Sequence, residues 1–372
     1  MSLGSQTKNT VCFAKGEFAY ISTVHPDLNN PKDLSIFEKT VKYFLKKNPK
    51  IITYDLHPEY QTTKYALQLH ATRYTLYATQ HHHAHIASCM IENGLKNQKV
   101  IGVAFDGTGL GANNTLWGAE FLLCDYRDFK RMAHLREVPL LGGENAILEP
   151  WRLAAIWLYF IFKENFLNLD LGLVRKMDKQ KWRILKSMYL SGVNAPLASS
   201  MGRLFDAVAG LVLDIKKVRF EAELAIELEK LATGFRHKDW RIRQEVWRNR
   251  LQATGYNFKI IKKDDGYILD PSLMFKEIIK DLQGKGAKEK IAYRFHLSVA
   301  EMIKMMCKAL KKKTKINTVI LSGGVFQNKI LLSLSLDLLS EEKFRIYYHK
   351  RLPCSDASLS LGQVAIANYK TP

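Results

Sequence analysis

The amino-acid sequence predicts an α/β protein built from two lobes. The chain has 372 residues, which is long for one simple domain and suits two. Apolar strands alternate with amphipathic helices along the first 135 residues, a pattern typical of an α/β sheet. Each half also contains a glycine-rich turn directly after an apolar strand. With 47% hydrophobic and 25% charged residues, the composition indicates a globular protein and excludes a disordered, collagen-like or coiled-coil chain.

In the first half, periodicity defines each element in turn. Residues 10–23 alternate around Lys15-Gly16, as a β-hairpin does. Residues 33–47 place apolar side chains on one side of a helix, and Gly94 ends a helix that spans 84–93. The other strands expected here are 51–54, 74–78, 100–105, 116–124 and 130–135, and the other helix is 60–71.

The second half is mostly helical from Glu149 to about Ala309. A strand at 318–321 then runs into a glycine-rich turn, and a helix, a strand at 345–349 and a last helix from Ser358 follow. We therefore expect an N-terminal lobe at 1–135 and a C-terminal lobe at 136–372, with a helical insertion near 233–270.

The two glycine-rich turns suggest a nucleotide held in a cleft between the lobes. They are Asp106-Gly107-Thr108-Gly109 and Ser322-Gly323-Gly324, and each follows an apolar strand. Glycine lets backbone N–H groups approach phosphate oxygens, and the N-terminus of a following helix adds positive potential. Either turn alone is weak evidence, because such turns often only change the direction of the chain. The two together favour phosphate binding.

The run Gln80-His81-His82-His83-Ala84-His85 is the most specific local feature of the sequence. On a helix, His81 and His85 share a face, so that both imidazoles can bind one metal ion. His82 and His83 point elsewhere. Two imidazoles leave the site incomplete, so we expect a carboxylate from another segment. Asp106 and Asp356 are the candidates because each follows a strand and opens a loop. The alternative is a run of surface histidines without a ligand.

The formal charge of +20 suits an anionic partner, whether nucleic acid, protein or substrate, or simply a solvated basic surface. Part of the excess lies at 236–250, where Trp240 and Trp247 are seven residues apart and share a helix face. Packing of that face onto the second lobe is favoured over stacking of the tryptophans on bases.

Cysteine usage and the chain start point to a cytoplasmic protein. Five scattered cysteines without a C-x-x-C pair argue against a disulfide framework or a zinc ribbon. Residues 1–30 lack a signal peptide, and no apolar run approaches the ~20 residues that span a bilayer, so no membrane partner is expected. Met1-Ser2-Leu3 is expected to be an expression leader.

Many separate motifs lie in one order along nearly the whole chain. They are Lys8-Asn9-Thr10, Asp55 to Pro58, His81 to Ile86, Phe105 to Gly109, Trp117 to Glu120, Glu149 to Arg152, Met201 to Ala207, Phe295-His296, Ser322 to Asn328 and Ser360 to Gln363. Together they resemble the C-terminal domain of HypF, the carbamoyltransferase of nickel–iron hydrogenase maturation. That domain belongs to the two-lobed actin/hexokinase/Hsp70-like (ASKHA) superfamily, and it is close to the catalytic subunit of tRNA threonylcarbamoyl transferase.

The resemblance implies roles position by position. His81 and His85 match the family's metal-binding histidines, and Asp356 matches its C-terminal aspartate ligand, for zinc, iron or magnesium. Asp106 would act at the first phosphate loop and touch the metal, and His82 would move a proton. ATP or AMP, as carbamoyl-adenylate, would be held by Lys8, Asn9 and Thr10 in the first hairpin, by Gly107, Thr108 and Gly109, by Asp206 on the ribose, and by Gly323, Gly324 and Asn328.

The chain departs from the family pattern in two ways. Ala357-Ser358 follow Asp356 where a glycine pair is usual, Ala119 and Ala222 replace typical glycines, and Glu144 replaces a typical aspartate, so that side-chain atoms are added near the nucleotide. The acylphosphatase-like, zinc-finger and adenylate-forming domains of full-length HypF are not matched. The chain thus resembles the last transfer module, which would receive carbamoyl-adenylate from an upstream adenylate-forming domain.

The resemblance implies carbamoyl transfer from carbamoyl-adenylate to the C-terminal cysteine of a HypE-like partner, with the metal polarising the carbamoyl oxygen. A threonylcarbamoyl-type enzyme that modifies tRNA is the first alternative, and the basic charge favours it. The residues of the motifs at 105–109 and 324–328 resemble HypF more than the tRNA enzyme, so nucleic acid is not the expected partner. A carbamoyltransferase for small-molecule hydroxyls and a nucleotide-binding scaffold without transfer activity remain open.

Overall fold

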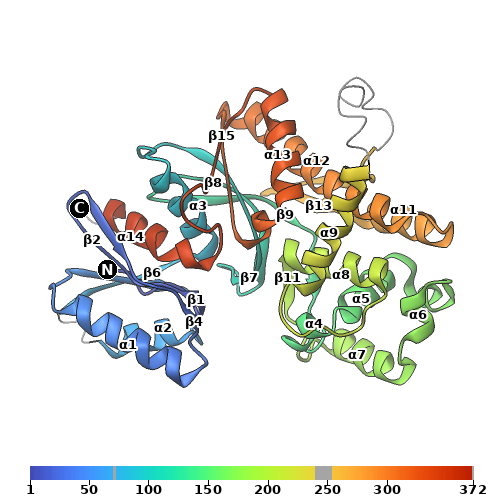
Figure 1. The fold of residues 1–372 in the computed structure, drawn as a ribbon, viewed down its shortest axis with the longest axis horizontal. Helices are drawn as coiled ribbons and strands as arrows, with labels where there is room; N and C mark the ends of the chain where they lie inside the picture. Colours follow the sequence, from blue (N-terminus) through green and yellow to red (C-terminus); the bar gives the residue numbers. More distant parts are fainter. Residues whose placement is uncertain (70–72, 239–253, 371–372) are drawn as a thin grey trace. The chain divides into compact units, whose positions relative to one another are not determined.

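The computed structural model describes residues 1–69, 73–238 and 254–370 (Figure 1). The chain falls into two compact units that interleave along the sequence. Unit 1 comprises Met1–Met132, Leu310–Gln327 and Lys343–Pro372, and unit 2 comprises Ala133–Ala309 and Asn328–Glu342. These units differ from the division after residue 135 that the sequence suggested, because two strands near the C-terminus pair with the sheet begun in the first half.

A mixed sheet forms the centre of unit 1. Its strand β7 (Val100–Leu110) pairs antiparallel with β8 (Leu116–Cys124) and parallel with β14 (Thr318–Ser322). Next to these lie β9 (Phe129–Leu135), beside β8, and β15 (Arg345–Tyr348), beside β14. Residues 100–105 of β7 are all buried, as expected for an apolar strand that is covered on both faces.

The first 79 residues make a second part of unit 1 with its own apolar core. The hairpin pairs β2 (Cys12–Lys15) with β3 (Phe18–Ile21), as predicted. The other elements are β1 (Thr7–Asn9), which pairs with β4 (His25–Asp27), α1 (Pro31–Leu45), α2 (Gln61–Gln68), and the parallel pair β5 (Ile51–Asp55) and β6 (Thr75–Thr79).

The first three residues, Met1-Ser2-Leu3, take part in the fold. Ser2 bridges the strands of Cys12 and Thr53, and Leu3 is completely buried. These residues contribute backbone hydrogen bonds and apolar contacts to unit 1.

Helix α3 (His81–Glu92) packs against β7 and against α14 (Leu359–Lys370) (Figure 1). The side-chain oxygen of Gln80 accepts the N–H of His83 at 2.8 Å and so caps the start of the helix. The contact between the two helices is very close at Gly362, where a Cβ atom would lie 1.9 Å from the carbonyl oxygen of Ala84. Only glycine leaves room for this approach.

Unit 2 is mainly helical, as predicted. Trp157 and Phe275 stack in its core at 5.1 Å between ring centroids. Its helices are α4 (Asn145–Leu148), α5 (Trp151–Phe162), α6 (Gly172–Lys176), α7 (Lys179–Ser191), α8 (Met201–Leu213), α9 (Glu223–Lys238), α11 (Ser272–Gln283), α13 (Lys329–Glu341), and α12 (Lys288–Thr314), whose last residues belong to unit 1.

The sequence predicts a helical insertion near 233–270, but the last part of that range forms short strands. The strands β12 (Lys259–Lys263) and β13 (Gly266–Asp270) form an antiparallel hairpin. The β-branched pair Ile260-Ile261 and the turn Asp264-Asp265-Gly266 favour this over a helix. A second pair joins β10 (Val138–Pro139) to β11 (Leu197–Ser200).

Two further expectations from the sequence concern the packing of two tryptophans and the absence of membrane spans. Trp240 and Trp247 lie outside the described residues, so their expected packing remains a prediction. Within the ranges that the structure describes, no helix combines the length and apolar character needed to cross a membrane.

Replacement of Gly362 by alanine tests the close contact of α3 and α14. Gly362→Ala should lower the free energy of unfolding by about 1–3 kcal/mol, because the new Cβ meets a backbone oxygen that cannot turn away. Gly234→Ala in α9 is the matched control, since its Cβ would meet nothing closer than 4.0 Å, and it should raise stability by about 0.5–1 kcal/mol. Urea unfolding measures both. Equal stabilities of wild type and Gly362→Ala would contradict the packing.

Candidate metal centre

Four potential metal ligands meet beside the first turns of α3. The imidazoles of His81 and His85 lie side by side at 4.9 Å between ring centroids and are almost completely buried. Asp106 and Asp356 face them, and one ligand atom from each of the four residues lies within 4.8 Å of the others. Both carboxylates that the sequence offered as alternatives are therefore present at the same point.

Asp106 reaches this point from a strand, which corrects the expected loop at Asp106 to Gly109. These residues belong to β7, where the pairing with β8 shifts between Phe105 and Gly109. A bulge of this kind redirects a side chain without ending the strand. Asp356 begins a single 3-10 turn, η4 (Asp356–Ser358), just before α14.

The spacing of these side chains fits a divalent cation. Nε2 of His81 lies 3.3 Å from Oδ2 of Asp106, and Nε2 of His85 lies 3.5 Å from a carboxylate oxygen of Asp106 and of Asp356. A bond of about 2.1 Å to a central metal places neighbouring ligands about 3.0–3.4 Å apart. Moreover, the buried Nε2 of His85 has no hydrogen-bond partner among the described residues. Two nitrogen and two oxygen donors suit zinc, iron or magnesium-like ions to different degrees and do not select one.

Asp55 orients His81. Its Oδ2 atom lies 2.7 Å from Nδ1 of His81, and its side chain is fully buried at the end of β5. Nδ1 therefore carries a proton that it donates to Asp55, and Nε2 faces the two other carboxylates, where a bound metal would take the place of the second proton. The sequence analysis places Asp55 in a family motif but assigns it no role. The signal for that role in the sequence is an acidic residue at the end of a buried strand.

The electrostatics of the cluster favour a positive charge at its centre. Burial by itself would lower the pKa of His81, but the charges of Asp55 and Asp356 hold that pKa well above its usual value. Burial would likewise raise the pKa of Asp106, yet the neighbouring imidazoles of His81 and His85 keep that pKa well below the usual range. The carboxylates therefore stay ionised although they are buried, and a cation would compensate them.

The other two histidines of the run point away, as expected. Nδ1 of His82 lies 3.1 Å from the Gln80 amide, its ring lies against Trp117, and burial keeps its pKa well below the usual value. Nε2 of His83 lies 2.6 Å from the carbonyl oxygen of Asp125, and burial lowers its pKa to about 4. His82 is thus a neutral imidazole, and its proton-transfer role remains a prediction.

Both glycine-rich segments lie in unit 1, which corrects their expected placement in different lobes. Gly323 has a φ of 102°, and a Cβ there would lie 2.2 Å from the carbonyl oxygen of Phe105. The next N–H, of Gly324, donates to Oδ1 of Asp106 at 3.0 Å. Gly109 lies against the rings of His81 and His82, with 2.8 Å between its hypothetical Cβ and either ring. These glycines therefore pack around the cluster.

The residues expected in the first phosphate turn precede the hairpin instead of forming it. Lys8 and Asn9 belong to β1, and Lys8 is exposed with a φ of 46°. The Asn9 amide donates to the carbonyl oxygens of Leu3 and Ser5. Thr10 donates to the carbonyl oxygen of Ala357, next to Asp356. Asn9 and Thr10 thus use their side chains within the fold, and phosphate contact by Lys8 to Thr10 remains a prediction.

Asp206 and Asn328 both lie in unit 2. Asp206 is buried 3.1 Å from a guanidinium nitrogen of Arg203, and burial raises its pKa to about 6. Asn328 caps α13 through Leu331, and its amide nitrogen lies 2.8 Å from Nε2 of His296. Their expected nucleotide contacts, together with those of Gly107 and Thr108, remain predictions.

Comparison with known proteins identifies the family. Residues 1–92 match the family model described as "HypF Kae1-like domain", and residues 102–363 match "Carbamoyltransferase, Kae1-like Domain, second subdomain". The chain belongs to the HypF carbamoyltransferase family. It is 32% identical to carbamoyltransferase HypF2 of Cupriavidus necator over all of its own length, which is 47% of that relative. It is 31% identical to the carbamoyltransferase HypF homolog of the same organism, of which it covers 91%.

Solved HypF structures share the fold. The chain aligns with full-length HypF in the phosphate- and nucleotide-bound form at a TM-score of 0.87 and 36% identity, over 99% of the chain and 46% of that protein. With T. kodakarensis HypF the TM-score is 0.83 and the identity 27%, over 98% of the chain and 47% of that protein. The predicted ASKHA-type α/β fold is thus confirmed. The chain spans about half the length of these HypF proteins.

Metal analysis of histidine variants tests the centre. The purified HypF-family chain should bind about one divalent metal ion, and His81→Ala should lose it, because the variant lacks one of the four clustered ligands. Asp55→Asn should weaken binding about 10–100-fold, since His81 loses the carboxylate that orients it. His83→Gln is the control from the same histidine run and should keep the metal. The same metal content in wild type and His81→Ala would exclude this site.

Proposed function

We propose that this chain transfers a carbamoyl group from carbamoyl-adenylate to a protein thiol, as the last module of a HypF-type carbamoyltransferase in hydrogenase maturation. The observation that carries the proposal is the buried cluster of His81, His85, Asp106 and Asp356 in a chain that matches carbamoyltransferase HypF over its whole length. Fold alone would not support a reaction, but a fitted ligand set in a family of carbamoyltransferases does.

The reaction is an acyl transfer at the carbamoyl carbon. The acceptor thiolate attacks that carbon, a carbon–sulfur bond forms, and the bond from the carbon to the phosphate oxygen breaks. AMP leaves with the electron pair of the broken bond. The products are a protein thiocarbamate and AMP, and no oxidant or reductant is needed.

The cluster would hold one divalent metal through His81, His85, Asp106 and Asp356. When bound, such an ion would supply positive charge that polarises the carbamoyl oxygen. Asp55 would then hold His81 in the tautomer whose Nε2 lone pair faces the metal. The N–H of Gly324 fixes the second oxygen of Asp106. These contacts hold the ligands in place before substrate arrives, so that little reorganisation is needed during the reaction.

The acceptor thiol is expected to come from another protein. Burial raises the pKa of Cys354 to about 11 and that of Cys12 to about 12, and it also raises the pKa of Cys89, Cys124 and Cys307. All five cysteines of the chain are thus protonated thiols near neutral pH, which are poor nucleophiles. This supports a HypE-like partner with a reactive C-terminal cysteine.

Carbamoyl-adenylate would come from an adenylate-forming domain such as that of longer HypF proteins, on the same or another chain. The nucleotide-bound state of the full-length HypF relative supports nucleotide binding, and we propose ATP or AMP as the nucleotide. The residues of unit 1 that we propose to lie near it are Lys8, Gly107, Thr108, Gly109 and Gly323. We also propose that the protein itself is located in the cytoplasm.

A transfer assay tests the function. The chain, synthetic carbamoyl-adenylate and a HypE-like acceptor should yield AMP and an acceptor heavier by one carbamoyl group. His81→Ala should slow the transfer at least about a hundredfold, since it removes charge stabilisation at the reacting group. Cys354→Ser should keep wild-type activity, because the nucleophile is the acceptor's own cysteine.

Two results would contradict the assignment. One is a carbamoyl group on Cys354 instead of on the acceptor. The other is efficient modification of tRNA or of a small-molecule hydroxyl when the thiol acceptor is left unmodified, and this result would favour one of the alternative transferases that the +20 charge and the histidine pattern allow.

A further inference from the structure

A buried chain of three side chains links the far end of α3 to the glycine turn after β14. The hydroxyl of Ser322 lies 3.0 Å from Nε2 of His349, and Nδ1 of His349 makes a short hydrogen bond with Oε2 of Glu92. The side chains of His349 and Glu92 are only 1% and 4% exposed, and Ser322 is completely buried. These three residues are not among the proposed metal ligands or nucleotide-binding residues.

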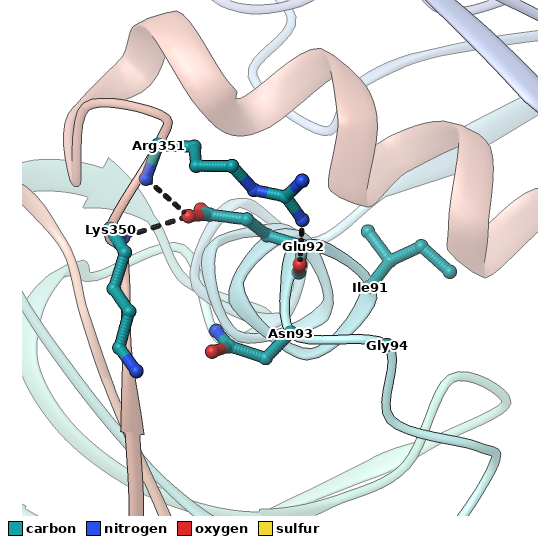
Figure 2. Close-up of a pocket in the computed structure, with 6 residues that line it drawn as sticks. All are labelled: Ile91, Glu92, Asn93, Gly94, Lys350 and Arg351. Carbon is teal, nitrogen blue, oxygen red and sulfur yellow. Dashed lines mark hydrogen bonds between the residues drawn. The ribbon is translucent and has the colours of Figure 1, made fainter.

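The direction of these hydrogen bonds follows from the contacts of Glu92. Its other oxygen, Oε1, accepts the backbone N–H groups of Lys350 and Arg351, each at 2.7 Å (Figure 2). A carboxylate with three donors is ionised, and these donors keep its pKa below the usual value although burial opposes them. Nδ1 of His349 therefore carries the proton, and burial lowers the pKa of His349, which keeps its imidazole neutral. Nε2 is then an acceptor for the Ser322 hydroxyl.

The hydrogen-bonded series of side chains leads to a proposed metal ligand, Asp106. Ser322 is the last residue of β14, and Gly323 and Gly324 follow directly. The turn lies on the backbone of Phe105, and the N–H of Gly324 donates to Oδ1 of Asp106, while Oδ2 of Asp106 faces the two imidazoles. A change in the direction of the Ser322 side chain would therefore shift the donor that fixes Asp106.

Helix α3 supplies both ends of this arrangement. Glu92 follows His85 by seven residues, which is two helical turns, so that both side chains project from the same face. One rigid element thus holds two imidazole ligands directly and Asp106 indirectly, through Glu92, His349 and the glycine turn.

We propose that Glu92, His349 and Ser322 are positioning residues that fix the Ser322-Gly323-Gly324 turn against Asp106 and thereby set the geometry of the metal centre. This inference rests on the proposed metal centre. A serine, a histidine and a carboxylate in sequence also resemble the nucleophilic triad of hydrolases. Here the serine has no exposed surface, which favours a positioning role over attack on a substrate.

Binding of Co²⁺ alone to the full chain tests the proposal, because its visible absorption reports the arrangement of nitrogen and oxygen ligands. Glu92→Gln keeps the shape of the side chain and the oxygen that accepts the backbone N–H groups of Lys350 and Arg351. Its amide N–H group, however, points toward Nδ1 of His349, so that the imidazole must donate to Ser322 instead of accepting from it. Ser322→Ala removes the hydroxyl. Each variant should raise the Kd for Co²⁺ about threefold to tenfold, less than Asp55→Asn, and shift the absorption of the bound ion.

Ser335→Ala is the matched control. Ser335 is also completely buried, and its hydroxyl has no hydrogen-bond partner in the part of the chain that the structure describes, so this variant should bind Co²⁺ as wild type does. Urea unfolding of each variant measures its stability separately. Lower stability with an unchanged Kd and an unchanged absorption spectrum would show a merely structural role and would overturn the proposal.

Two further results separate this inference from the function on which it rests. If His81→Ala loses Co²⁺ while Glu92→Gln and Ser322→Ala bind it as wild type does, the positioning role is wrong and the metal centre stands. If His81→Ala binds Co²⁺ normally, the metal centre itself is wrong. Labelling of Ser322 by a fluorophosphonate would also overturn the proposal, because it would show a reactive nucleophile.

Discussion

The burial of ionised carboxylates beside two histidines is the constraint on which the rest of unit 1 depends. Isolated charges lose several kcal/mol of solvation when they leave water, so a buried carboxylate persists only with close donors or a cation. Here three of the four ligands are held from a second direction: His81 by Asp55, Asp106 by Gly324, and the turn of Asp356 by Ser88, whose hydroxyl donates to the carbonyl oxygen of Ser358. Helix α3 presents the two imidazoles on one face, and the glycine contact with α14 covers that helix closely.

Local patterns in the sequence predicted most elements of the fold. Strong periodicity and turn chemistry located the hairpin at 12–21, helix α1, strand β8 and the helix that carries His81 and His85, because these features depend on neighbouring residues. The helical spacing also predicted that the two imidazoles share a face. The strand-then-loop pattern offered Asp106 and Asp356 as candidate carboxylates, and the HypF resemblance assigned the ligand role to Asp356, about 270 positions after the histidines.

What could not be predicted depends on contacts between distant segments. The glycines after Asp106 suggested a loop, but pairing with β8 keeps them in a bulged strand. The turn at Gly323 belongs to unit 1 only because β14 pairs with β7. Asp55 and Glu92 lacked a visible role, since their partners, His81 and His349, are fixed by tertiary packing. Glu92 did carry a signal, because it continues the helix face of the histidines two turns later.

Anomalous X-ray scattering from crystals of the protein grown with Co²⁺ tests the central claim most directly. The account predicts one strong peak about 2.0–2.3 Å from Nε2 of His81, Nε2 of His85, and one carboxylate oxygen each of Asp106 and Asp356. A crystal in which these four side chains stay together by direct hydrogen bonds, with no peak among them at saturating Co²⁺, would contradict it.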